Sequence, residues 1–153
     1  MDTLKFGFIG CGNMGGSLAR AVTRAVGGVN VTLSDISDVK AKVLADELNC
    51  KSDVTKDVAQ SSNYIFLGVK PQVMKSCLEE IAPVLRERRD RFVLVSMAAG
   101  VTIGEIKEMI GADYPVIRIM PNTPVSVGEG MILYTADKNV FMDELSAFIE
   151  AMR

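Results

Sequence analysis

The chain has 153 residues, of which 48% are hydrophobic and 24% charged, with a net charge of −2. This composition is typical of one folded domain with a substantial core, and the interspersed charges argue against a nucleic-acid-binding surface. The sequence contains no histidine, which excludes a histidine base, catalytic triad or histidine metal ligand within this chain.

Three scattered cysteines without C-x-x-C spacing argue against a disulfide framework and a zinc site, and they indicate a reducing compartment. No apolar run is as long as a membrane span, and the first residues do not resemble a signal peptide. We therefore expect a cytoplasmic protein that binds no metal, no membrane and no nucleic acid.

Short apolar runs alternate with longer helical patterns along the chain. The expected strands span residues 4–9, 29–33, 50–52, 64–69, 92–97, 116–120 and 131–134. The expected helices span 17–26, 39–48, 55–60, 72–85, 102–110 and 143–153, with a late break at Pro83 and a solvated connection over 86–91. Repeated strand–helix units predict an α/β fold with a doubly wound, mostly parallel sheet. Phe6 and Phe66 are expected in its core.

A G-x-G-x-x-G motif lies between the first strand and the first helix. Gly10 is expected to make the tight turn, Gly12 to let the backbone approach a pyrophosphate, and Gly15 to let helix and strand pack closely. The helix N-terminus then offers unpaired N–H groups and a positive dipole end to phosphates. This order of elements predicts a Rossmann-type dinucleotide-binding domain, and an ordinary glycine-rich turn is the alternative.

Ligands of doubly wound sheets bind at the carboxyl ends of the strands, so Asp35 after the second strand is a candidate. Its carboxylate can hydrogen-bond both ribose hydroxyls of NAD and would repel the 2′-phosphate of NADP, although a cap or turn role is also open. Ser34, Ser37 and Lys40 favour the phosphate, because hydroxyls and an ammonium can hold it. The sequence favours NADH and leaves NADPH open.

Two further strand ends carry candidate residues. Lys70 precedes Pro71, which favours an extended backbone and can bring the ammonium beside the cofactor, unless Lys70 is an ordinary surface lysine. The second candidate is the loop Met120–Pro124, whose prolines stiffen the backbone around Asn122 and Thr123. A rigid connector is the alternative interpretation of this loop.

Four motifs together resemble pyrroline-5-carboxylate reductase. They are G-F-I-G-C-G-N-M-G at 7–15, V-K-P-Q at 69–72, S-M-A-A-G-V at 96–101 and R-I-M-P-N-T-P at 118–124. They follow the family's order over nearly the whole chain, and the second and fourth are far more specific than the first. The resemblance implies reduction of Δ1-pyrroline-5-carboxylate to L-proline with NADH or NADPH, the last step of proline biosynthesis.

The resemblance and the strand ends together indicate two groups of site residues. The expected cofactor-binding residues are Ile9, Gly10, Cys11, Gly12, Asn13, Met14, Ser34, Asp35, Thr55, Gly68, Val69, Lys70 and Pro71. The residues expected beside the nicotinamide and the substrate are Ala98, Ala99, Gly100, Met120, Pro121, Asn122 and Thr123. Two positions depart from the family, which often has a basic residue where Ile36 stands and tends to have asparagine where Thr55 stands.

Members of the family continue into an all-helical domain that forms the dimer and supplies much of the substrate pocket, including a hydroxyl proton donor. We therefore expect residues 1–153 to be the dinucleotide-binding domain alone, without that helical domain, and the whole protein to be a homo-oligomer. Two alternatives stay open. One is a domain of a β-hydroxyacid or 6-phosphogluconate-type dehydrogenase, and the other is a non-catalytic nucleotide-binding module.

Overall fold

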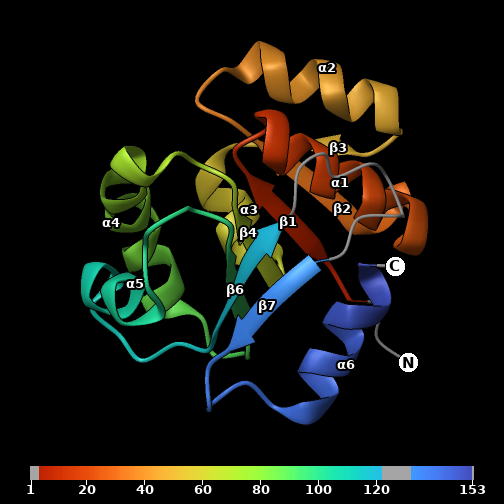
Figure 1. Ribbon diagram of the computed structural model, residues 1–153. Coiled ribbons are helices and arrows are strands. Elements are labelled where there is room, and N and C mark those ends of the chain that lie inside the picture. Colours follow the sequence, from red (N-terminus) through yellow and green to blue (C-terminus); the bar gives the residue numbers. More distant parts are fainter. Residues whose placement is uncertain (1–3, 122–131, 153) are drawn as a thin grey trace.

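The computed structural model describes residues 4–121 and 132–152, and within these ranges the strands form one seven-stranded sheet. The strand order is β3-β2-β1-β4-β5-β6-β7, with six parallel strands and β7 antiparallel to β6 (Figure 1). The strands are β1 (Phe6–Ile9), β2 (Val31–Ser34), β3 (Lys51–Ser52), β4 (Tyr64–Leu67), β5 (Val93–Ser96), β6 (Val116–Pro121) and β7 (Ile132–Ala136). The prediction of a doubly wound, mostly parallel sheet is confirmed.

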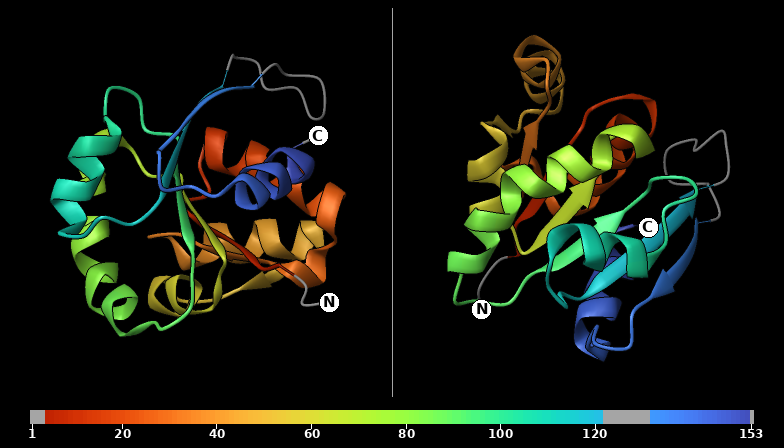
Figure 2. Two further views of the ribbon diagram at one scale, coloured as in Figure 1. Left: turned by 90° about the horizontal axis from the view of Figure 1, so that it is seen from below. Right: turned by 90° about the vertical axis from the view of Figure 1, so that its left-hand side faces the viewer.

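Helices cover both faces of the sheet, as the two views of Figure 2 show. The helices are α1 (Asn13–Val26), α2 (Asp38–Leu48), α3 (Thr55–Ser61), α4 (Pro71–Glu87), α5 (Ile103–Ile110) and α6 (Met142–Ala151). Helices α1, α2 and α6 pack on one face, and α3, α4 and α5 on the other. Because both faces are covered, every residue of β1, β4 and β5 is buried, as expected for central parallel strands.

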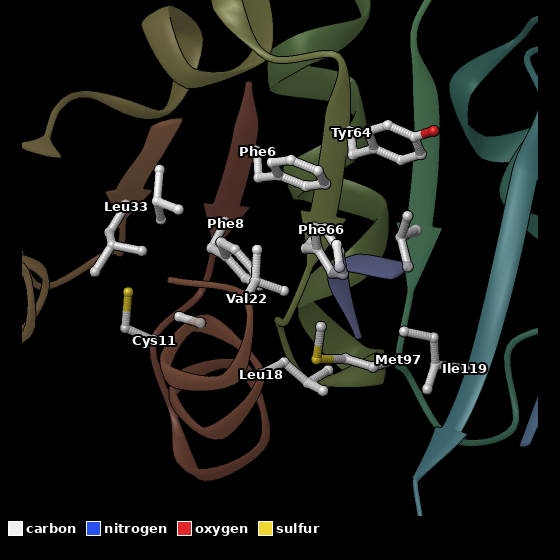
Figure 3. Close-up of a cluster of buried hydrophobic side chains, with 14 of the residues drawn as sticks. Phe6, Phe8, Cys11, Leu18, Val22, Leu33, Tyr64, Phe66, Met97 and Ile119 are labelled. Carbon is white, nitrogen blue, oxygen red and sulfur yellow. The ribbon is translucent and has the colours of Figure 1, made fainter. Parts of the chain in front are cut away.

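Aromatic side chains fill the core between the sheet and helices α1, α2 and α6 (Figure 3). The rings of Phe8 and Phe66 stack at 4.3 Å between centroids, and Phe148 of α6 lies 6.3 Å from Phe66. Leu18 and Val22 of α1 complete the cluster and are fully buried. The predicted core positions Phe6 and Phe66 are confirmed, at 3% and 0% exposure.

The expected break at Pro83 is wrong, because α4 continues through Pro83 to Glu87. Proline inside a helix costs about 3 kcal/mol. Ile81 and Leu85, which flank it, are at most 1% exposed, and burying each such side chain contributes about 1.5–3 kcal/mol. The apolar face of the helix therefore outweighs the proline.

The expected solvated connection over residues 86–91 is also wrong at Arg88, whose side chain is only 4% exposed. Its Nη1 donates to the carbonyls of Ala59 and Ser62, at 2.8 and 2.7 Å. A guanidinium here satisfies carbonyls at the C-terminal end of α3, where the helix dipole favours a cation. Arg88 thus ties α4 to α3.

Smaller differences concern element ends. Helix α1 begins at Asn13, four residues earlier than expected, because Gly15 and Gly16 belong to it and not to the turn. Residues Gly28–Asn30 form a 3-10 turn before β2, and β4 ends at Leu67. In the part of the chain described here, no helix combines the length and apolar character needed to cross a membrane.

Candidate functional site

Three glycines bring two loops into direct backbone contact. Gly10 has a φ of +102°, and a Cβ added to it would lie 2.6 Å from the carbonyl of Gly68. A Cβ on Gly15 would overlap the Gly10 carbonyl oxygen, and one on Gly68 would lie 2.9 Å from that same oxygen. The turn after β1, the start of α1 and the end of β4 are therefore packed closely at a point that admits no side chain.

Gly12, by contrast, borders open space, since a Cβ added there would meet no atom within 4 Å. Gly12 is the N-cap of α1, and no side chain caps this helix within the described ranges. The backbone N–H groups of the first helical turn are thus available beside an open loop. This arrangement fits a pyrophosphate, which binds at helix N-termini through such N–H groups.

A pocket of about 400 Å³ opens beside the glycine loop. Eight of the expected cofactor-binding residues line it: Ile9, Gly10, Gly12, Asp35, Thr55, Gly68, Val69 and Lys70. The volume falls within the range of small-molecule sites. Residues far apart in sequence are therefore brought together at the carboxyl edge of the sheet, where the parallel strands β1, β2 and β4 end.

Asp35 connects the loop after β2 to the glycine loop. Its Oδ2 accepts the backbone N–H of Cys11 at 2.6 Å, and its Oδ1 accepts the N–H of Ser37 at 3.0 Å. The carboxylate therefore has the turn role named as an alternative, and Asp35 lines the pocket as well.

The three groups that favoured a 2′-phosphate differ in their surroundings. The Ser34 hydroxyl is buried and accepts a hydrogen bond from Thr55 Oγ1 at 3.3 Å. The Ser37 hydroxyl caps α2 by accepting the N–H of Lys40 at 3.2 Å. Lys40 is exposed and lines the pocket. Of these three residues, Lys40 is therefore the one whose side chain lines the pocket.

Cys11 lies under the loop and not in the pocket wall. Its thiol donates to the Ser34 carbonyl at 3.4 Å, and burial, with the nearby Asp35 carboxylate, raises the pKa of Cys11 to about 12. Met14, in the first turn of α1, is half-buried and packs against the core. A thiol with so high a pKa stays protonated at neutral pH, so Cys11 packs the loop and is not a nucleophile.

One wall of the pocket was not expected from the sequence. It consists of Val73, Ser76, Cys77 and Glu80, which share one face of α4 at spacings of three and four residues. Cys77 is buried, which raises its pKa to about 12, with a further contribution from Glu80. The periodic pattern following V-K-P-Q is the signal that points to this face, because a helix starting at a strand's carboxyl end flanks the site.

Lys70 has the extended backbone that the following proline favours, with φ −64° and ψ 151°, and it is the N-cap of α4. Pro71 is the first residue of that helix, which confirms the expected backbone effect of the proline. Lys70 lines the pocket beside Val69 and Gly68. The end of β4 therefore supplies a cation to the site.

Some of the residues expected beside the nicotinamide are described by the structure, and these do not line the pocket. Ala98 is buried after β5, Ala99 and Gly100 form an exposed turn, and Met120 is 43% exposed near the end of β6. Pro121 is the last residue of β6, and Asn122 and Thr123 lie outside the described residues. Strands β5 and β6 are parallel to β4, so Ala98, Met120 and Pro121 lie along the same edge of the sheet as the pocket.

The fold and the glycine loop define a Rossmann-type dinucleotide-binding domain. The family model described as "NADP oxidoreductase coenzyme F420-dependent" matches residues 5–100, and the chain belongs to this family. The pyrroline-5-carboxylate reductase of Escherichia coli K12 is 35% identical over 97% of this chain and 55% of its own length. The chain thus spans about half the length of the curated relatives it matches.

Solved structures of pyrroline-5-carboxylate reductases are also similar to this chain. A pyrroline-5-carboxylate reductase from Coxiella burnetii superposes with a TM-score of 0.89 at 26% identity, over 99% of this chain and 56% of that one. The Plasmodium falciparum pyrroline carboxylate reductase with NADP bound gives 0.81 at 28% identity, over 99% and 55%. The resemblance to this group of reductases, first seen in the motifs, is confirmed.

Proposed function

We propose that this chain is the dinucleotide-binding half of a cytoplasmic pyrroline-5-carboxylate reductase, which reduces Δ1-pyrroline-5-carboxylate to L-proline with NADH or NADPH. The observation that carries the proposal is the 35% identity to the E. coli reductase across 97% of the chain. That match reaches well beyond the glycine loop that many dehydrogenases share. Three free cysteines, two of them buried, are consistent with a reducing compartment.

The cofactor would bind along the edge of the sheet. Gly10, Gly12 and the N-terminus of α1 would hold the pyrophosphate, and Asp35 would lie beside the adenosine ribose. The adenine would occupy the part of the pocket between Ile36 and the face of α4. Lys70, at the end of β4, would lie near the nicotinamide ribose.

The bound nicotinamide would supply a hydride, and the residues of this chain would position it. A protonated cyclic imine is already electrophilic, so this half needs no general base, in agreement with the absence of histidine. Ala98, which follows β5, and Met120, near the end of β6, would border the nicotinamide and the substrate. The proton donor and the contacts of a homo-oligomer would come from a helical second domain.

A domain fusion tests this proposal. Residues 1–153 are joined to the C-terminal half of the E. coli reductase. Oxidation of NADH and NADPH is followed with pyrroline-5-carboxylate, and reduction of NAD+ and NADP+ is followed with 3-hydroxyisobutyrate or 6-phosphogluconate. We expect oxidation that depends on pyrroline-5-carboxylate, while residues 1–153 alone bind cofactor and turn over little. Reaction with a hydroxyacid and NAD(P)+ instead would favour the dehydrogenase alternative. A folded fusion that binds cofactor and acts on none of them would favour a non-catalytic module.

A further inference from the structure

A second pocket, of about 410 Å³, lies at the opposite edge of the sheet from the cofactor pocket. Phe92 and Pro115 line it and come directly before the parallel strands β5 and β6, whereas Gly68 of the cofactor pocket comes directly after β4. The charged residues of this second pocket are Arg86, Arg88, Arg89, Asp90, Arg91 and Asp113. Cations therefore outnumber carboxylates in its lining, although the whole chain has a net charge of −2. We infer that this arginine pocket binds a phosphate ester with an aromatic body.

Both carboxylates of the arginine pocket are already paired. Asp90 accepts hydrogen bonds from Nε and Nη2 of Arg88, at 2.9 and 2.6 Å. Asp113 pairs with Lys107 of α5, which does not line the pocket. Each carboxylate is therefore bound to a cation other than the two most exposed arginines of the pocket.

Two of the four arginines are engaged as well. Arg88 donates to an aspartate and to two backbone carbonyls. Arg91 donates from Nε and Nη2 to the carboxylate of Glu144, at 2.5 and 2.9 Å. Arg86 and Arg89 are exposed, and neither forms an ion pair within the described part of the chain. These two guanidiniums supply the free positive charge of the pocket.

Two free guanidiniums in one pocket favour a doubly charged ligand. Like charges at one site repel each other, and an anion bound between them offsets that repulsion. The planar fork of a guanidinium matches a phosphate, which can accept two parallel N–H bonds from it. A phosphate ester carries a charge of about −1.5 to −2 at neutral pH, whereas a carboxylate carries a single charge. Arg86 and Arg89 therefore fit a phosphate better than a carboxylate.

The rest of the lining offers flat surfaces for an aromatic group. Phe92 is buried, and its ring lies 4.8 Å from the ring of Tyr114 between centroids, at an angle of 57°. The Cζ of Arg88 lies over the Phe92 ring, 4.7 Å from its centroid. Tyr114 is half-buried, so part of its ring is accessible for stacking. The volume of the pocket lies within the range of small-molecule sites.

An ordinary helix end is the alternative interpretation of the free arginines. Arg86 lies in the last turn of α4, where a cation stabilises the helix through its dipole whether or not a ligand binds. Arg24 has the same place in the last turn of α1, is exposed and does not line the arginine pocket, so it provides a matched control. A dipole role alone predicts that replacing either arginine leaves ligand binding unchanged.

The test is titration of the 153-residue chain with phenyl phosphate, followed by NMR spectroscopy, with glycerol 3-phosphate and benzoate as comparison ligands. The titrations are repeated with saturating NADH, because the glycine loop can also bind phosphate. We expect phenyl phosphate to bind about three- to tenfold more tightly than glycerol 3-phosphate, since only its ring can stack on Tyr114. Benzoate, with one charge, should bind more weakly than phenyl phosphate. Saturating NADH should leave the Kd of phenyl phosphate unchanged, because the two pockets lie at opposite edges of the sheet.

Substitutions locate the binding. The double variant Arg86→Met and Arg89→Met should weaken phenyl phosphate binding at least about tenfold, because it removes both charge-assisted contacts. Arg24→Met should leave the Kd unchanged. Tyr114→Leu should remove the preference for phenyl phosphate over glycerol 3-phosphate.

Four results overturn the inference: no binding of phenyl phosphate, equal Kd values for phenyl phosphate and glycerol 3-phosphate, an unchanged Kd in the folded double variant, or loss of binding when NADH is present. If a variant does not fold, as judged by circular dichroism, the ligand ratios of the unmodified chain and the competition with NADH decide. The two pockets share no lining residue, so each of these outcomes leaves the proposed reductase function unaffected.

Discussion

Two glycines of the site should respond differently to substitution by alanine. In Gly68→Ala the new methyl would lie 2.9 Å from the Gly10 carbonyl oxygen and 3.2 Å from the Gly15 Cα, so two backbone segments must move. In Gly12→Ala the methyl would meet nothing within 4 Å, and the φ of −72° suits alanine. Gly68→Ala should therefore reduce stability, and Gly12→Ala should reduce cofactor binding.

The magnitudes follow from these distances. Overpacking against fixed backbone costs about 1–3 kcal/mol, and we take about 2 kcal/mol for Gly68→Ala. For a domain of this size that lowers the Tm by about 4–8 °C. For Gly12→Ala, the poorer N-cap and the reduced freedom of the unfolded chain nearly cancel, so stability should change by less than about 0.5 kcal/mol. Its methyl would occupy the space proposed for the pyrophosphate, and the Kd for NADH should rise at least about tenfold.

Thermal unfolding by circular dichroism gives the first quantity, and calorimetric titration with NADH gives the second. If Gly12→Ala binds NADH as tightly as the unmodified chain, the pyrophosphate does not approach the backbone at Gly12. If Gly68→Ala keeps the same Tm, the two loops are not packed as closely as the distances indicate. Either result would refute the corresponding part of the reasoning.

Three further predictions concern stability. Arg88→Met leaves two carbonyls at the end of α3 without their donor and should cost about 2–4 kcal/mol in urea unfolding, whereas exposed Arg89→Met should change little. Phe148→Ala opens a cavity beside Phe66 and should cost about 3–5 kcal/mol, and Met142→Ala, at an 80% exposed position of the same helix, is the control. Burial raises the pKa of Cys77 from 9.0 to about 12, so the stability it contributes is complete below pH 9 and is lost as the pH rises towards 12. The Tm of Cys77→Ala should therefore fall less between pH 8 and about 10.5 than that of the unmodified chain, and an equal fall would contradict the assigned pKa.

The parts of the fold that depend on local pattern were predictable. Alternating apolar runs and helical segments indicated the sheet, and the glycine spacing indicated the turn at Gly10 and the close packing at Gly15. The antiparallel direction of β7 was not predictable, because an apolar run does not encode the direction of the chain. The continuation of α4 through Pro83 depends on burial that only the tertiary structure supplies.

The candidate site also has features that the sequence predicted and features that it did not. Asp35 and Lys70 could be proposed because each directly follows a strand, and both line the pocket. The bond from Cys11 N–H to Asp35 joins residues 24 positions apart and has no sequence signal. The wall from Val73 to Glu80 was missed because its polar members resemble an ordinary solvent-facing helix surface.

The contact among Gly10, Gly15 and Gly68 also limits how this sequence can evolve. In most cores, a residue that grows can be accommodated by a neighbour that shrinks, so pairs of positions drift together. Here each position has the smallest side chain available, and the obstructing atoms are main-chain atoms. No second substitution can restore the space, so each of the three positions is constrained independently. A homologue with a side chain at one of them would need a different separation between the loops after β1 and β4.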